Sequence, residues 1–155
     1  MRINIDVQVP MRDGVIMSSD IYMPQGDGPF PALMLRTIYD KQSDRYIEWT
    51  ERFVQAGYAC VMQDCRGRHE SDGAWEPYVH EADDGHDTVE WIASQPWSDG
   101  NVGAYGVSYL GFTQTQPATQ RSPHLKAIAP IASQQDNYGH HRVDGVLQQH
   151  VAQYF

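Results

Sequence analysis

The stretch NVGAYGVSYLG, residues 101–111, places one serine among glycines where a strand pattern gives way to a helix pattern. Three interpretations of Ser108 follow from these residue types. It can be a nucleophile on a sharp strand-to-helix turn, the small residue of a phosphate-binding loop, or the N-cap of the helix. The nucleophile would need Gly106 two positions earlier, because a side chain there would collide with the turn.

The phosphate-loop interpretation fits these residues poorly. In GVSYLG the serine stands at the second glycine of G-x-G-x-x-G, where a pyrophosphate needs close backbone approach. An acidic residue should also end the next strand about 20 residues on, and the strand pattern AIAPIAS, 127–133, carries none. Pattern alone does not decide between nucleophile and cap, since the second glycine of the usual G-x-S-x-G motif comes one place late, at Gly111.

The elements around this serine predict an α/β fold. An Asp-Gly turn at 13–14 predicts an antiparallel hairpin of a half-buried strand over 3–9 and a returning strand over 15–24. Apolar stretches typical of buried strands then alternate with helical stretches; the strands are 32–39, 59–67, 101–107 and 125–133, and the helices 43–59, 81–95 and 108–116. This alternation predicts a parallel sheet with helices on both faces.

The last part of the chain differs in pattern. In RVDGVLQQHVAQYF, apolar residues recur at helical spacing and predict an amphipathic helix over 142–155. Nothing follows on which this helix could pack, so we expect the chain to be part of a longer protein. Residues 1–135 would be the N-terminal part of one domain and 136–155 the start of a further, helical segment. Half a sheet leaves an edge exposed, which favours association, including a homo-oligomer.

Composition excludes several classes of protein. The chain has 155 residues, 41% of them hydrophobic and 20% charged, and a formal net charge of −9. These values are typical of a globular domain, and the acidic charge argues against a nucleic-acid partner. No stretch approaches a membrane span, and the two cysteines form no disulfide framework or zinc pattern. We expect a cytoplasmic protein acting on a small molecule, with no cofactor and no membrane partner.

Five stretches in order resemble one family: VPMRDGVIMSSDIYMP, LRTIYDK, GYACVMQDCRGRHESDGAW, WIASQPWSDGNVGAYGVSYLG and LKAIAPIAS. Together they are similar to the N-terminal part of the cocaine esterase / X-Pro dipeptidyl-peptidase (S15-like) family. That family includes α-amino acid ester hydrolases and glutaryl acylases. The resemblance implies an α/β-hydrolase fold, with a helical cap inserted after the sixth strand and a C-terminal jelly roll. The family's own motif is G-x-S-Y-x-G, so the late glycine is a family feature.

The resemblance also implies roles for three residues. Ser108 matches the nucleophile, and the backbone N–H of Tyr109 matches one donor to the oxyanion. Tyr39, in the stretch IYDK, matches the tyrosine whose hydroxyl supplies the other donor, a role that suits a neutral phenol. These roles imply hydrolysis of an ester or amide through an acyl-enzyme on Ser108, with ester chemistry favoured because nothing in the sequence recognises a free amino terminus.

The base and acid that a serine nucleophile needs are not evident in the sequence. Each should follow a further strand of the sheet, and no strand pattern lies between 133 and 155, so we expect both beyond Phe155. A catalytically incomplete fragment, or a binding domain that lacks the triad, is the alternative.

Charged residues near the predicted site have structural interpretations. We expect Asp40 and Lys41 to brace the loop, Arg66 to form an ion pair, and the acidic residues of 83–87 to stabilise a helix start without binding a metal. Pro117 predicts that the helix after Ser108 is short or bent.

Overall fold

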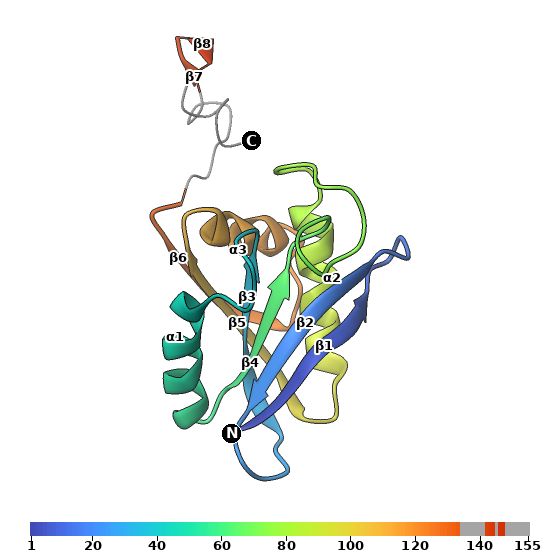
Figure 1. Cartoon of the computed structure of the whole chain (residues 1–155), viewed down its shortest axis with the longest axis vertical. Helices are drawn as coiled ribbons and strands as arrows, with labels where there is room; N and C mark the ends of the chain where they lie inside the picture. Colours follow the sequence, from blue (N-terminus) through green and yellow to red (C-terminus); the bar gives the residue numbers. More distant parts are fainter. Residues whose placement is uncertain (134–141, 145, 148–155) are drawn as a thin grey trace.

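A six-stranded sheet forms the centre of the molecule in the computed structural model, which describes residues 1–133, 142–144 and 146–147 (Figure 1). The sheet strands are β1 (Arg2–Pro10), β2 (Ile16–Met23), β3 (Phe30–Thr37), β4 (Ala59–Asp64), β5 (Ser98–Val107) and β6 (Leu125–Ile131). The helices are α1 (Asp44–Gln55), α2 (Glu81–Ser94) and α3 (Tyr109–Ala118). None of them is long and apolar enough to cross a membrane, among the residues described.

The strand order is β1-β2-β4-β3-β5-β6. β1 and β2 form the predicted antiparallel hairpin, closed by the hydrogen bond from the Gly14 N–H to the Met11 carbonyl. β2 runs antiparallel to β4, whereas β3, β4, β5 and β6 are mutually parallel. The carboxyl ends of these parallel strands therefore meet at one edge, where α/β proteins place their sites.

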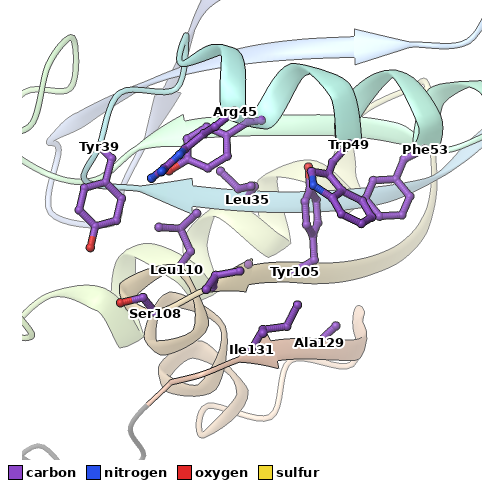
Figure 2. A pocket seen from close by; sticks show the side chains of 13 residues that line it. Leu35, Tyr39, Arg45, Trp49, Phe53, Tyr105, Ser108, Leu110, Ala129 and Ile131 are labelled. Carbon is purple, nitrogen blue, oxygen red and sulfur yellow. The ribbon is translucent and has the colours of Figure 1, made fainter.

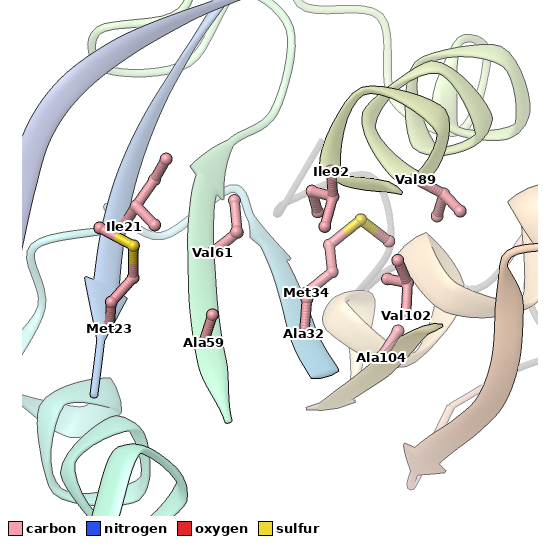
Figure 3. Close-up of a cluster of buried hydrophobic side chains, with 10 residues drawn as sticks. All are labelled: Ile21, Met23, Ala32, Met34, Ala59, Val61, Val89, Ile92, Val102 and Ala104. Carbon is pink, nitrogen blue, oxygen red and sulfur yellow. The ribbon is translucent and has the colours of Figure 1, made fainter. Parts of the chain in front are cut away.

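Helices cover both faces of the sheet, as the alternating pattern predicts. On one face, α2 packs Val89 and Ile92 against the strands (Figure 3); the strand residues of this core are Ile21, Met23, Ala32, Met34, Ala59, Val61, Val102 and Ala104. On the opposite face, α1 packs Tyr46 and Val54 against a second core. α3 lies beside α2 and over β5 and β6.

The two outer strands are more exposed than the sequence predicts. Ile3 and Ile5 are 47% and 53% exposed, because β1 is an edge strand whose register shifts between Asn4 and Val7, and only its Val9 is fully buried. The prediction of a buried strand over 125–133 is also wrong. The residues of β6 are exposed or half-buried, because β6 is the other edge of the described sheet.

The helix predicted from residue 142 onward is wrong for the described residues 142–144 and 146–147. There the two short strands β7 (Arg142–Val143) and β8 (Val146–Leu147) pair in antiparallel fashion. The Asp-Gly sequence at 144–145 is typical of a two-residue hairpin turn, and Asp144 has φ +51°, so turn chemistry prevails over the helical spacing. The remainder of that predicted helix, and most of the predicted segment 136–155, lie outside the described residues.

α3 is the short helix that Pro117 predicts, since it ends one residue later at Ala118. The proline also serves the packing of α2 on α3. A Cβ built on Gly85 of α2 would lie 2.7 Å from Pro117 Cγ and 3.2 Å from Arg36 Nη1. The close approach of the two helices therefore requires a glycine at 85.

Gly85→Ala should destabilise the protein, by about 1–3 kcal/mol, because the added methyl group overpacks the contact between α2 and α3. In an open helix position the same change stabilises, by up to about 1 kcal/mol. The sign is therefore the test, and thermal or denaturant unfolding of wild type and variant measures it. A variant with higher stability than wild type would contradict the packing described.

Candidate functional site

The backbone at Ser108 makes a sharp turn between β5 and α3. Ser108 has φ +62° and ψ −123°, a conformation that residues other than glycine rarely adopt, and its side chain is exposed. Such strain costs about 1–3 kcal/mol and persists only when its surroundings fix it. Here the Ser108 N–H donates to the Ile131 carbonyl at 2.9 Å, and the Ser108 carbonyl accepts from the N–H groups of Gly111 and Phe112. The strained turn expected at this serine is present.

Two glycines allow this turn. Gly106 has φ +150°, and a Cβ on it would lie 2.5 Å from Leu110 Cβ, so the predicted need for a glycine two residues before the serine is confirmed. A Cβ on Gly111 would collide with the side chain of Ser133, just after β6. The late glycine thus has a steric reason: it lets the first turn of α3 lie against the end of β6.

Two buried polar side chains hold α3 to the sheet below the turn. Gln114 donates to the carbonyls of Leu110 (2.8 Å) and Gly106 (3.3 Å) and accepts from the Ala129 N–H at 3.0 Å. Thr113 donates to the Arg36 carbonyl at 3.1 Å. The sequence offers no signal for these contacts, because polar residues at these helix positions are equally common on a solvent-exposed face.

Tyr39 and Ser108 both line an apolar cavity of about 640 Å³ on the α1 face of the sheet. Figure 2 shows the Tyr39 hydroxyl directed toward the end of the cavity where the Ser108 hydroxyl lies. Tyr39 is 42% exposed and follows β3, and its backbone N–H donates to Thr37 Oγ1 at 2.9 Å. The rest of the lining is mainly apolar and includes Leu35, Trp49, Phe53, Tyr105 and Ile131.

Lys41 anchors the loop that carries Tyr39. Its ammonium group is buried, donates to Glu70 at 2.6 Å and Asp6 at 2.9 Å, and lies 3.1 Å from Asp20. Burial alone would lower the pKa of Lys41, but these carboxylates raise it above its ordinary value. Its backbone N–H donates to Asp64. The predicted bracing role of Lys41 is confirmed.

Asp40 also braces this loop, as predicted. Its carboxylate accepts from the Gln42 N–H at 2.9 Å, and its carbonyl accepts from the Ser43 N–H at 3.2 Å. These contacts lead the loop into the first turn of α1, whose N-cap is Ser43.

The side chain of Tyr109 ties the start of α3 to α2. Its buried hydroxyl donates to Glu81 Oε1 at 2.9 Å and accepts from the Tyr78 N–H at 3.0 Å. Burial and the neighbouring Glu81 carboxylate raise the pKa of this phenol well above its ordinary value. Glu81 Oε2 accepts in turn from Arg36 Nη1 at 2.8 Å, so a buried ion pair lies directly beneath the turn. Sequence reasoning missed Glu81 and Arg36, although a charge within the apolar β3 stretch was a signal.

Several further charges at this edge form ion pairs. Arg66 donates to both oxygens of Asp84, at 2.6 and 3.0 Å, and pairs with Asp13 at 2.8 Å, which confirms its predicted ion pair. Asp83 and Asp87 pair with Arg12 from the β1–β2 turn. The acidic residues of 83–87 thus lie at the start of α2, and no group of three His, Cys, Asp or Glu among the described residues could hold a metal ion.

The described histidines have partners other than Ser108. His69 contacts the Ile38 carbonyl, His80 contacts Glu76, His86 contacts Arg12 and His124 contacts Glu90. The acidic residues and histidines that follow position 133 could be considered as acid or base. Four of them lie outside the described residues: Asp136, His140, His141 and His150. The fifth, Asp144, lies in the turn between β7 and β8. The described residues therefore contain the serine and two candidate oxyanion donors without a histidine hydrogen-bonded to that serine.

The strand order, the strained turn at Ser108 and the helix that follows it define an α/β-hydrolase fold. Comparison with solved structures agrees. A CocE/NonD family hydrolase from Staphylococcus aureus superimposes with a TM-score of 0.75 at 34% identity, over 81% of this chain and 26% of that one. An α-amino acid ester hydrolase gives a TM-score of 0.76 at 31% identity, over 86% of this chain and 25% of that one.

The chain belongs to the X-Pro dipeptidyl-peptidase (S15) family, whose pattern it matches over residues 13–155. It is 49% identical to the cocaine esterase of Rhodococcus sp. (strain MB1 Bresler) over 138 residues, which is 86% of this chain and 24% of that protein. A putative serine esterase of Mycobacterium bovis is 34% identical over 155 residues. The chain spans about a quarter of the length of these relatives. The family expected from the sequence motifs is confirmed.

Asp6→Asn should reduce stability at neutral pH and lose its effect in acid. Hydrogen bonds, first that from Lys41, lower the pKa of Asp6 from 3.8 to about 2. A carboxylate with a lowered folded-state pKa stabilises the fold above its unfolded pKa, and this contribution disappears as pH falls from near 4 toward 2. Denaturant unfolding at a series of pH values measures the difference between wild type and variant.

Asp27→Asn, in the exposed loop before β3, is the matched control. It should unfold like wild type throughout the pH series. A stability difference for Asp6→Asn that is the same at about pH 6 and about pH 2 would contradict the ion pair with Lys41.

Proposed function

We propose that this chain carries the nucleophile and both oxyanion donors of a serine hydrolase that cleaves ester bonds. The observation that carries the proposal is the exposed serine held at φ +62° at the start of α3, at the same end of one cavity as the Tyr39 hydroxyl. A strained backbone at an exposed polar residue is typical of a site where geometry serves chemistry. The family supports the same conclusion, since relatives in it bear the names of esterases and dipeptidyl-peptidases.

In this proposal Ser108 Oγ attacks the ester carbonyl carbon while a general base takes its proton. The carbonyl oxygen becomes an oxyanion, which accepts hydrogen bonds from the Tyr39 hydroxyl and the Tyr109 N–H. Tyr109 is the first residue of α3, so its N–H also lies at the positive end of the helix dipole. Collapse of the intermediate expels the alcohol, which takes up the proton, and water then hydrolyses the acyl group from Ser108.

We propose that the base and its acid partner come from a part of the protein beyond this chain. Two observations support this. The described histidines are engaged elsewhere, and the chain corresponds to about a quarter of its relatives. A histidine on a loop that reaches the Ser108 end of the cavity would complete the site. The chain alone would then be folded for attack but not activated for it.

Ester cleavage is favoured over amide cleavage. The more similar relative, at 49% identity, is named an esterase, whereas the putative Xaa-Pro dipeptidyl-peptidase of Bacillus cereus is 30% identical over 111 residues. A dipeptidyl-peptidase must also bind a free α-ammonium group. The lining of the cavity next to Ser108 is mainly apolar and contains a cation, Arg45, which would repel such a group.

A fluorophosphonate probe should label Ser108 in the full-length protein, with loss of fluoride as Ser108 Oγ bonds to phosphorus. Ser108→Ala should abolish labelling and ester turnover, and Ser94→Ala, at an exposed position in the last turn of α2, is a matched control that should retain both. Mass spectrometry of the labelled peptide identifies the site. Absence of labelling, or labelling at another serine, would contradict the proposed nucleophile.

Tyr39→Phe should lower kcat of the full-length protein by about 10²–10³-fold, because it removes one oxyanion donor and leaves the ring in place. KM and thermal stability should change little. Steady-state hydrolysis of a p-nitrophenyl ester measures kcat and KM.

Tyr58→Phe is the control for the loss of a tyrosine hydroxyl, since Tyr58 precedes β4 and so lies at the opposite end of the sheet. It should keep wild-type kcat. If Tyr39→Phe did the same, Tyr39 would have no role in stabilising the oxyanion.

A further inference from the structure

We propose that Glu81 is a positioning residue for the oxyanion site, acting through the hydroxyl of Tyr109 on one donor and through Arg36 on the other. This inference rests on the proposed function. The backbone N–H of Tyr109 is one proposed donor, but its side chain points the other way, into the protein. The new element is the role of that buried side chain and of the carboxylate that binds it.

Hydrogen bonds and ring contacts hold the Tyr109 side chain in place. The hydroxyl donates to Glu81 Oε1 at 2.9 Å and accepts from the Tyr78 N–H at 3.0 Å. The ring lies against Trp75, Tyr78 and Phe112, with centroid distances of 5.7, 5.0 and 5.9 Å. Since the backbone nitrogen and the side chain are bonded to the same Cα, a ring held in place restrains the peptide between Ser108 and Tyr109.

Glu81 also connects this peptide with the strand that leads to Tyr39. Its second oxygen, Oε2, accepts from Arg36 Nη1 at 2.8 Å. Arg36 lies in β3, three residues before Tyr39, is fully buried, and donates from Nε to Gln63 Oε1 on β4. The two oxygens of one carboxylate thus bind two elements: β3, which leads into the loop of Tyr39, and α3, whose first residue is Tyr109.

The position of Glu81 bears on how the two oxyanion donors are held during the reaction. An oxyanion hole works when both donors are directed at the position that the developing charge will occupy. The Ser108 backbone is strained and would relax if its neighbours allowed it. The Glu81 carboxylate binds both Tyr109 and Arg36 of β3. It therefore opposes that relaxation and keeps the two donors at a constant separation. Its loss should therefore affect the transition state more than the binding of substrate.

The test compares Tyr109→Phe, Glu81→Gln and the double variant in the full-length protein. Tyr109→Phe keeps the ring contacts and removes only the hydroxyl. Tyr22→Phe is the control: it removes a hydroxyl from another buried tyrosine, on β2, outside the site. Two quantities are measured, kcat and KM for p-nitrophenyl acetate, and Ki for an alkyl trifluoromethyl ketone, whose hemiketal oxygen occupies the oxyanion position.

We expect Tyr109→Phe to lower kcat about tenfold, to raise Ki by the same factor, and to leave KM within about twofold. The double variant should have the kcat of its slower parent, because Glu81 acts through Tyr109 on the same peptide. Tyr22→Phe should match wild type in kcat and Ki.

Wild-type values of kcat and Ki in Tyr109→Phe would overturn the proposal. Changes in kcat and Ki no larger than those of Tyr22→Phe would also overturn it. So would a double variant whose loss of kcat is the product of the losses in the two single variants. If Glu81→Gln does not fold, the Tyr109→Phe result decides alone. A wild-type protein without ester turnover and without fluorophosphonate labelling of Ser108 would instead refute the proposed function, and this inference with it.

Discussion

The backbone of Ser108 must stay in a conformation that its own preferences disfavour, and much of the surrounding structure maintains it. The carbonyl of Ile131 holds its N–H, and the first turn of α3 holds its carbonyl. Gly106 leaves room for Leu110, and Gly111 leaves room for Ser133. These contacts come from β5, α3 and the end of β6, so the turn forms only when all three elements are in place. The serine is consequently exposed at the carboxyl end of β5, on a turn that neighbouring elements hold.

Buried ion pairs hold the elements that surround the site. Buried ions are costly unless they are paired and hydrogen-bonded, and three buried cations at this edge of the sheet are paired with carboxylates. Lys41 meets three carboxylates below the Tyr39 loop, Arg36 meets Glu81 below Tyr109, and Arg66 meets Asp84 beside them. Hydrophobic contacts could fill the same space but would not define one orientation so closely. We therefore regard these ion pairs as the means by which two loops and a helix terminus keep a common geometry.

The sequence predicts the elements well where local chemistry and burial agree. Alternating strand and helix patterns, the Asp-Gly turn and the glycines around Ser108 suffice to place the site at one edge of a parallel sheet. Prediction fails where the outcome depends on distant neighbours: Ile3 and Ile5 look half-buried but lie on an edge strand. The role of Glu81 also escapes it, because a buried hydrogen bond between residues 28 apart leaves no local pattern. The same holds for Gln114, which binds Ala129, 15 residues away. The short β7–β8 hairpin shows an Asp-Gly turn prevailing over helical spacing.

A crystal structure of the full-length protein inactivated by a fluorophosphonate would show the nucleophile and the oxyanion donors together. We expect phosphorus bonded to Ser108 Oγ, with the phosphonyl oxygen roughly 2.7–3.1 Å from both the Tyr39 hydroxyl and the Tyr109 N–H. We also expect Ser108 to keep its positive φ in the adduct. An adduct on another residue, or a phosphonyl oxygen directed away from both donors, would contradict it.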